Sequence, residues 1–287
     1  MSSRSIRTLL RNSSALLTIA YDIGRAYPIA FQKRRKIIRI ATLRDQITHQ
    51  PYLHKKNKAS LVIFDKDGTL ICFQSMWVPW ALSVAKCIDE ATKLNIREEI
   101  YKVLGFSPVE NRVKPGLLAE GTLSQIHEAL ARILIRHGIA SSEAIAYVDE
   151  AIKESNKVTT HSMKEIYDLQ LLFNQLRENN VKIAICTSDS RFGTMNTLKK
   201  LKLDKLVDVV VCGDDAGAMP KPHPHNALSI CRLLDVDPLD TLVVGDTLAD
   251  MGMGRSANLG GTVGVLSGVC NGDELRPLAD HIVSYFC

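Results

Sequence analysis

The sequence lacks several features by which chains are often assigned to a class. Its seven cysteines form no C-x-x-C pair and no spacing typical of a zinc site. Their odd number, in a chain of 287 residues, is most simply explained by a reducing compartment. No stretch approaches the roughly 20 apolar residues that a transmembrane helix needs. The most apolar stretch, residues 16–31, carries Asp22, Arg25 and Pro28. We therefore expect no transmembrane segment.

Acidic residues are absent from the first 21 positions and rare up to residue 60. Residues 1–60 hold 13 Lys and Arg but only Asp22 and Asp45, a formal charge of +11. Apolar side chains among the first 17 residues recur roughly at helical spacing, between arginines and many hydroxyl residues. This composition is typical of a mitochondrial transit peptide, so we predict a mitochondrial protein with a basic leader at 1–60. The alternative is a disordered basic tail or a surface helix on a cytoplasmic protein.

The rest of the chain is acidic, and nothing in the sequence predicts a nucleic-acid partner. Residues 61–287 hold 23 Lys and Arg and 29 Asp and Glu, a formal charge of −6. The basic run at 33–36 lies in the leader, without interleaved aromatic residues or a companion motif. The overall charge of +5 is therefore the sum of a basic leader and an acidic body.

Beyond residue 60, short apolar runs alternate with helical patterns. The apolar runs have the length of strands and are Leu61–Phe64, Val181–Cys186, Val207–Cys212, Thr241–Val244 and Thr262–Leu266. The helical patterns between them cover 162–179, 191–202, 223–234 and 248–257. This alternation predicts an α/β fold with a doubly wound, Rossmann-like parallel sheet.

One long interval after the first run contains no clear strand. It shows helical patterns at 80–104, 116–137 and 142–156 instead. In a compact α/β domain, an interval of this length indicates an inserted subdomain rather than a loop. We predict an all-helical cap at 74–160, inserted into a catalytic core formed by 61–73 and 161–287.

Acidic residues follow several of the predicted strands, where open α/β sheets bind their ligands. Asp65 and Asp67 come directly after the first run, two residues apart. In extended backbone, both carboxylates should point to the same side, and Lys66 between them should point away. Two carboxylates on one side can take different catalytic roles, one as a nucleophile and the other as a general acid and base. Lys66 is therefore left out of the catalytic set.

The repulsion between these carboxylates calls for a cation. Asp246 and Asp250, one helical turn apart, add oxygen ligands, and an oxygen-only site with room for a phosphate suits Mg²⁺. Lys221 can neutralise an anionic intermediate. Thr187 and Ser188 offer a hydroxyl and backbone N–H groups to a phosphate oxygen. Together these residues predict phosphoryl transfer to an aspartate.

At this point the chain resembles the haloacid dehalogenase-like hydrolase superfamily. Four motifs occur in order: F-D-K-D-G-T at 64–69, I-C-T-S at 185–188, K-P at 221–222, and V-G-D at 244–246 with Asp250 four residues on. The resemblance covers about residues 61–267. It implies that Asp65 forms an aspartyl-phosphate, and that Asp67 protonates the leaving oxygen and then activates water.

The resemblance also implies roles for the other motif residues. Thr187 would hold the phosphoryl group, and Lys221 would stabilise both the nucleophile and the phosphate. Asp65, the backbone carbonyl of Asp67 and Asp246 would bind Mg²⁺, with Asp250 as a further or an outer ligand. The cap would close over the site and exclude water.

The acid at position 67 favours a phosphatase or a phosphomutase, because dehalogenase members of the superfamily lack an acid there. The segments 187–190 and 264–268 look most like those of phosphoglycolate phosphatases. We predict a Mg²⁺-dependent phosphatase that acts on a small phosphorylated metabolite, a phosphomonoester such as phosphoglycolate. The alternatives are a phosphomutase of the same superfamily and a non-catalytic module that binds a phosphorylated ligand. The sequence leaves the oligomeric state open.

Residues of the predicted cap offer two kinds of substrate contact. Trp77 and Trp80 follow the first motif and would either wall the pocket or pack in the core of the cap. Four basic residues would either meet a substrate anion or be ordinary exposed helix cations; they are Arg112, Lys114, Arg132 and Arg136.

Overall fold

The computed structural model describes residues 59–284, except for the side chains of residues 158–162. The predicted basic leader at 1–60 therefore lies almost wholly outside the described residues. Among the helices that are described, none is long and apolar enough to cross a membrane.

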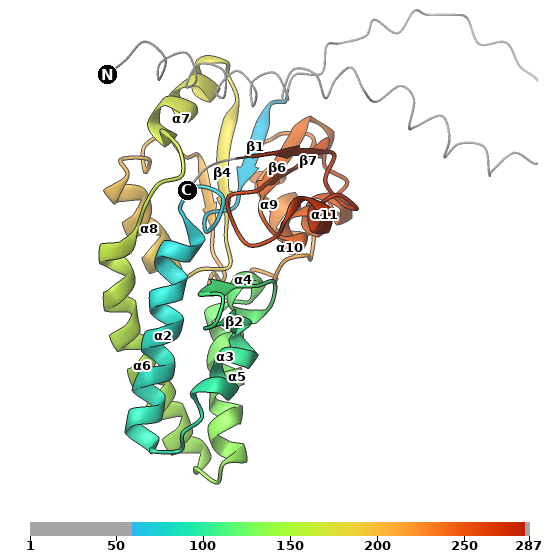
Figure 1. Cartoon of the computed structure of the whole chain (residues 1–287). Helices are drawn as coiled ribbons and strands as arrows, with labels where there is room; N and C mark the ends of the chain where they lie inside the picture. The colour runs from blue at the N-terminus through green and yellow to red at the C-terminus, as the bar shows by residue number, and fades with distance from the viewer. Residues whose placement is uncertain (1–58, 285–287) are drawn as a thin grey trace, which may run out of the picture. The chain divides into compact units, whose positions relative to one another are not determined.

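A six-stranded parallel sheet forms the core, in the strand order β5-β4-β1-β6-β7-β8 (Figure 1). Its strands are β1 (Leu61–Phe64), β4 (Lys182–Cys186), β5 (Val209–Val211), β6 (Thr241–Gly245), β7 (Gly261–Val265) and β8 (His281–Val283). Five of them are the strands expected from the apolar runs, and the predicted fold class is confirmed. The edge strand β8 was not predicted, because its three half-buried residues form too short a run to stand out in sequence.

Helices cover both faces of this sheet, as a doubly wound fold requires. Alternate residues of β1 point to opposite faces. Leu61 and Ile63 pack in one cluster with side chains of α9 (His225–Leu233) and α10 (Leu248–Ser256). Phe64 points the other way, and its ring lies 5.4 Å from that of Phe173 in α7 (Leu169–Glu178). The remaining helices of the core are α8 (Arg191–Lys200), α11 (Gly272–Leu275) and the 3₁₀ turn η1 (Pro238–Asp240).

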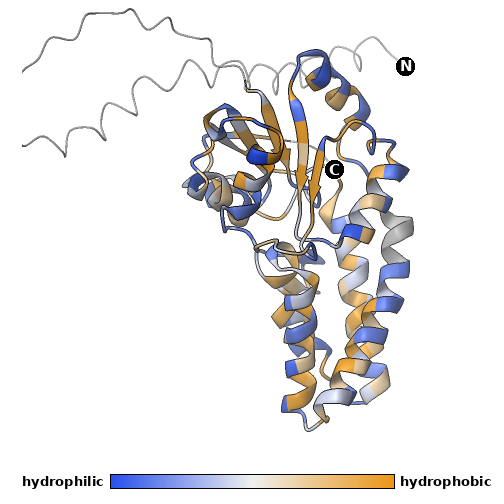
Figure 2. Ribbon diagram, turned by 180° about the vertical axis from the view of Figure 1, so that it is seen from behind, coloured by the Kyte–Doolittle hydropathy of each residue, from blue (hydrophilic) through white to orange (hydrophobic). Residues whose placement is uncertain are grey.

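A helical insertion, which we call the cap, occupies residues 73–162 between β1 and β4 (Figure 1). Its helices are α2 (Phe73–Thr92), α3 (Arg97–Leu104), α4 (Leu117–Glu120), α5 (Leu123–Arg136) and α6 (Ser141–Ser162). It also contains one short antiparallel ribbon of β2 (Phe106–Ser107) and β3 (Arg112–Val113). The cap has its own apolar core, in which Trp80 is fully buried and donates from Nε1 to Asn156 Oδ1 at 2.9 Å. In Figure 2 the strands are mostly hydrophobic, whereas the cap helices carry hydrophobic and hydrophilic residues side by side.

Several helix boundaries differ from the sequence prediction, most clearly at the end of the cap. The pattern at 162–179 predicted one helix, but α6 ends at Ser162 and α7 begins only at Leu169. Asp168 starts α7, because its side chain accepts a hydrogen bond from the Leu171 backbone N–H at 2.9 Å. Between the two helices, the backbone of Glu165 bridges to Ile71, which joins the two segments that connect the cap to the core.

Candidate active site

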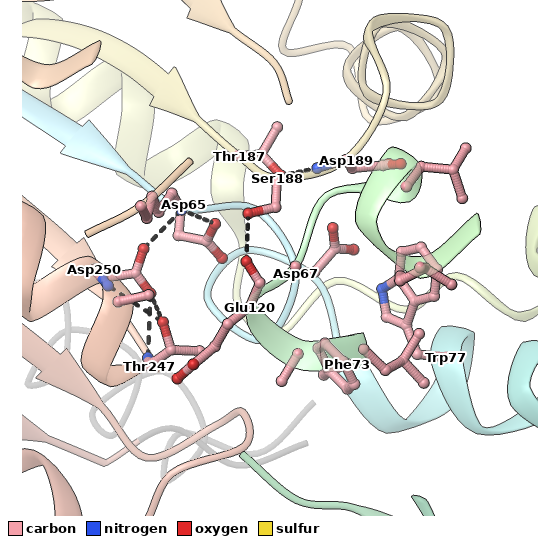
Figure 3. A pocket seen from close by; sticks show the side chains of 17 residues that line it. Asp65, Asp67, Phe73, Trp77, Glu120, Thr187, Ser188, Asp189, Thr247 and Asp250 are labelled. Atoms are coloured by element: carbon pink, nitrogen blue, oxygen red, sulfur yellow. Dashed lines mark hydrogen bonds and ion pairs between the residues drawn. The ribbon is translucent and has the colours of Figure 1, made fainter. Parts of the chain in front are cut away.

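The carboxyl ends of three adjacent strands bring the predicted site residues together. β1 lies between β4 and β6, and Asp65 continues the ladder by donating its N–H to the Val244 carbonyl at 2.9 Å. A pocket opens there, and six of the seven predicted site residues line it: Asp65, Asp67, Thr187, Ser188, Lys221 and Asp250 (Figure 3). The seventh, Asp246, is fully buried, and one of its carboxylate oxygens lies within 4.8 Å of those of Asp65 and Asp250.

Asp65, Asp246 and Asp250 form a buried carboxylate cluster. Burial raises the pKa of Asp65 to about 7, because Lys221 only partly offsets it and the charges of Asp250 and Asp67 add to it. Burial also raises the pKa of Asp246 well above its usual range, and the charges of Asp65 and Asp250 raise it further. Three carboxylates in so small a space are the donor set that a hard divalent cation such as Mg²⁺ prefers. The residues present therefore fit this ion.

Asp246 is held firmly in this cluster. It accepts hydrogen bonds from Thr69 Oγ1 at 3.2 Å and from the Val269 backbone N–H at 2.9 Å. The two donors follow β1 and β7, so loops on either side of β6 orient one carboxylate. Neither was predicted, because Thr69 and Val269 are far from Asp246 in sequence and only the order of the strands brings them close.

Lys221 joins two members of the cluster. Its ammonium lies 2.6 Å from Asp65 Oδ1 and 2.7 Å from Asp250 Oδ1, and its side chain is only 5% exposed. Burial alone would lower the pKa of Lys221, but the charges of Asp250 and Asp65 outweigh it and raise the pKa well above the usual value. Lys221 is therefore a fixed positive charge beside the carboxylate predicted to be the nucleophile.

Asp250 uses its second oxygen to begin α10. Asp250 Oδ2 accepts from the Thr247 hydroxyl at 2.6 Å and from the Thr247 N–H at 3.1 Å, and the Thr247 hydroxyl also accepts from the Asp250 N–H at 3.3 Å. This capping box orients the helix start. In the described structure, Asp250 thus positions Lys221 as well as belonging to the acidic cluster.

The expectation that Lys66 points away from its acidic neighbours is wrong. Its ammonium lies 2.7 Å from Asp67 Oδ2 and 2.9 Å from Asp189 Oδ2, and the residue is fully buried. The prediction assumed that extended backbone continues through residue 67. However, β1 ends at Phe64, and the chain turns at once with Gly68 at a φ of +91°. Lys66 and Asp67 therefore lie on the same side and form an ion pair.

Asp67 and Asp189 share the charge of Lys66. Burial raises the pKa of Asp67, and the adjacent ammonium of Lys66 opposes this rise. Asp189 comes directly after the second motif and also lines the pocket. The sequence did not predict this triad of Lys66, Asp67 and Asp189, because the three side chains meet only where the ends of β1 and β4 are neighbours.

Ser188 and Thr187 make different contacts at the end of β4. Ser188 donates its hydroxyl to the backbone carbonyl of Glu120 at 3.0 Å, which ties the core to the cap. Thr187 is buried, and its hydroxyl accepts from the Asp189 N–H at 3.2 Å.

The cap supplies the opposite wall of the pocket. Phe73, Trp77, Leu118, Leu123 and Ile126 line it together with Glu120 (Figure 3). Of the two predicted tryptophans, Trp77 thus lines the pocket and Trp80 packs in the core of the cap. Burial raises the pKa of Glu120, and the charge of Asp250 raises it further.

None of the four cap cations named from the sequence lines the pocket. Lys114, Arg132 and Arg136 form exposed ion pairs with Glu110, Glu128 and Glu99 respectively. Arg112 donates instead to the Val269 carbonyl at 2.9 Å, which is a second tie between cap and core.

Comparisons with known proteins agree with this arrangement. The family model of haloacid dehalogenase-like hydrolases matches residues 59–258. Among curated proteins, the chain is 40% identical over 200 residues to the pyrophosphatase PpaX of Bacillus mycoides, covering 70% of this chain and 80% of that protein. It is 28% identical over 201 residues to the pyrophosphatase PpaX of Bacillus cereus, with the same coverage.

Solved structures share the fold. A predicted phosphoglycolate phosphatase from Haemophilus somnus superposes with a TM-score of 0.61 at 16% identity, covering 78% of this chain and 92% of that one. A beta-phosphoglucomutase from Clostridium difficile superposes with a TM-score of 0.54 at 20% identity, covering 79% and 91%.

Proposed function

The chain belongs to the haloacid dehalogenase-like hydrolases, and on that premise we propose that it is a Mg²⁺-dependent phosphatase that hydrolyses a small phosphomonoester through an aspartyl-phosphate. One observation carries this proposal. Asp65 and Asp67 line the same pocket, and the Lys221 ammonium lies 2.6 Å from Asp65. A nucleophile, a proton carrier and a fixed cation thus surround one space.

In the first step, a carboxylate oxygen of Asp65 attacks phosphorus, and the bond between phosphorus and the ester oxygen breaks. Asp67 gives its proton to that oxygen, which leaves as an alcohol. Burial raises the pKa of Asp67, which favours its protonated form, and the ammonium of Lys66 opposes this rise. In the second step, Asp67 takes a proton from water, and the water oxygen attacks phosphorus. Inorganic phosphate leaves and Asp65 is regenerated.

The remaining site residues bind and orient the phosphoryl group. Lys221 and Thr187 would contact its oxygens, with backbone N–H groups beside Ser188. Asp65, the backbone carbonyl of Asp67 and Asp246 would hold Mg²⁺, with Asp250 as a further or an outer ligand. When bound, the ion supplies positive charge that offsets the charge of the transferring phosphoryl group.

Phosphate release from p-nitrophenyl phosphate tests this function. We expect turnover with Mg²⁺ and none with a chelator, and Asp65→Asn should reduce turnover to background because an amide is not a nucleophile. Asp204→Asn, at an exposed acid of the core, is the matched control and should retain activity. If the wild type shows no turnover and a folded Asp65→Asn variant still binds the metal, the protein is a binding module instead. Interconversion of phosphate isomers primed by a bisphosphate would indicate a phosphomutase.

We also propose, on composition alone, that the basic leader at 1–60 directs the protein to mitochondria. A reporter fused to these residues should enter mitochondria. A reporter that remains in the cytosol would refute this localisation.

A further inference from the structure

The pocket has two chemically different ends. The phosphoryl end carries Asp65, Asp250 and Lys221, and the opposite end is built by apolar side chains of the cap (Figure 3). Those side chains come from three helices: Phe73 and Trp77 from α2, Leu118 from α4, and Leu123 and Ile126 from α5. A group that leaves from phosphorus toward the cap therefore meets hydrocarbon and aromatic rings.

The residues lining the pocket offer no cation to a second anionic group. Five of them are acidic: Asp65, Asp67, Glu120, Asp189 and Asp250. Lys221 is the single basic residue in this lining, and both Asp65 and Asp250 already pair with it. A carboxylate or a second phosphate on the leaving group would enter next to Glu120 and apolar side chains, where a charge is unfavourable without a partner.

Trp77 adds an N–H donor beside Asp67. Its indole Nε1 is buried without a hydrogen bond of normal geometry. It faces Asp67, and this contact lowers the pKa of that carboxyl. The ring is held by edge contact with Trp80 at 5.5 Å and by Phe73 at 6.1 Å. In Figure 3 the nitrogen points toward Asp67, on the path between the phosphoryl end and the cap. An acceptor oxygen on a bound ligand would complete the hydrogen bonding of this N–H.

From these observations we propose that the substrate is a phosphate monoester of an uncharged, largely apolar alcohol. Its hydrocarbon part lies against Phe73, Trp77 and Leu118, and one of its oxygens accepts a hydrogen bond from Trp77 Nε1. This inference rests on the proposed phosphatase function and narrows its substrate. It disfavours both phosphoglycolate, which carries a carboxylate, and pyrophosphate, which is named for the bacterial relatives and carries a second phosphate.

Three compounds test the inference with Mg²⁺ present: benzyl phosphate, phosphoglycolate and pyrophosphate. The first two both release primary alcohols, so their comparison tests the charge and the apolar character of the leaving group together. We expect kcat/KM for benzyl phosphate to exceed that for either anion at least tenfold. An equal or higher value for phosphoglycolate or pyrophosphate would overturn the inference and leave the phosphatase function standing. Failure to hydrolyse any of them or p-nitrophenyl phosphate would overturn the function itself.

Two pairs of variants identify the residues responsible. Glu120→Gln should raise the ratio of kcat/KM for phosphoglycolate to that for benzyl phosphate threefold or more, because it removes a like charge from the pocket. Glu98→Gln, an exposed change on α3, should leave the ratio unchanged. An unchanged ratio in Glu120→Gln would count against the charge argument.

Trp77→Phe keeps an aromatic ring and removes the N–H. It should lower kcat/KM for benzyl phosphate about threefold to tenfold, as expected for one hydrogen bond. Tyr147→Phe removes a hydroxyl from the cap outside the pocket and should have no effect. Equal activity of Trp77→Phe and wild type would contradict the hydrogen bond to the substrate.

Discussion

Lys66 is a fully buried ammonium that forms ion pairs with both Asp67 and Asp189. Burial alone would lower its pKa, but the two carboxylates outweigh burial and raise the pKa above its usual value. The cation thus remains charged across the physiological range. It holds the side chain of Asp67 at the pocket, so Lys66 is a positioning residue for the proposed proton carrier.

Replacing Lys66 should therefore be costly to stability. Lys66→Met leaves two carboxylates buried without their cation, and breaking a buried ion pair from one side costs about 3–5 kcal/mol. We expect a loss of this size in the free energy of unfolding measured with urea. Lys102→Met, at an exposed lysine of α3, should change it little. A loss below about 1 kcal/mol for Lys66→Met would show that the triad is not a stabilising unit.

At the scale of elements, two loops approach Asp246 so closely that only glycine fits. Gly68, in the turn after β1, has a φ of +91°, and a Cβ there would lie 2.4 Å from Asp246 Oδ2. Gly268, in the loop after β7, would place a Cβ 1.8 Å from the same oxygen. Both distances are far below van der Waals contact. The position of the buried carboxylate thus depends on the backbone of both loops.

Gly68→Ala tests the close approach, and the chain provides a matched control. Gly217 has a similar φ of +80°, but a Cβ there would meet nothing within 4 Å. Both variants carry the backbone strain of a side chain at positive φ, about 1 kcal/mol. Only Gly68→Ala should displace Asp246, and we expect a loss of about 100-fold or more in Mg²⁺-dependent kcat/KM. Equal losses in both variants would attribute the effect to strain alone.

At the scale of the whole molecule, the site holds several negatively charged carboxylates in a buried position. Asp65, Asp246 and Asp250 share one ammonium, that of Lys221, so the cluster stays negative when all three are ionised. The pKa of Asp65 is raised from 3.8 to about 7, and that of Asp246 is raised as well. Between pH 3.8 and about pH 7, Asp65 is more protonated in the folded protein than in the unfolded chain, so the folded protein binds more protons. Metal-free stability therefore falls as the pH rises from about 4 toward 7.

Mg²⁺ should reverse this trend, since it binds ionised carboxylates. We expect the melting temperature of chelator-treated protein to be lower at about pH 8 than at about pH 5.5. Mg²⁺ should raise the melting temperature more at the higher pH. Asp246→Asn, which removes one charge from the cluster, should reduce both the pH dependence and the effect of Mg²⁺. An equal effect of Mg²⁺ at both pH values would contradict the ionisation of the cluster as the cause.

The sequence by itself determined the class of fold and the residues that meet at its centre. Alternating apolar runs predict parallel strands, and acids at the ends of those runs must gather at one edge of the sheet. Asp65, Asp67 and Thr187 were found in this way and line one pocket, whereas Lys221 was recognised from the K-P motif. The physical reason is that strand ends are local features, readable from hydrophobicity, and the parallel arrangement then places them.

Only the tertiary structure decided which side chains pair across those ends. Lys66 was expected to point away, yet the turn after Phe64 directs it to Asp67 and Asp189. The choice of Trp77 rather than Trp80 for the pocket, and the approach of Glu120, follow from how the cap packs on the core. Such contacts join residues far apart in sequence, and their geometry depends on backbone turns and packing that no local pattern records.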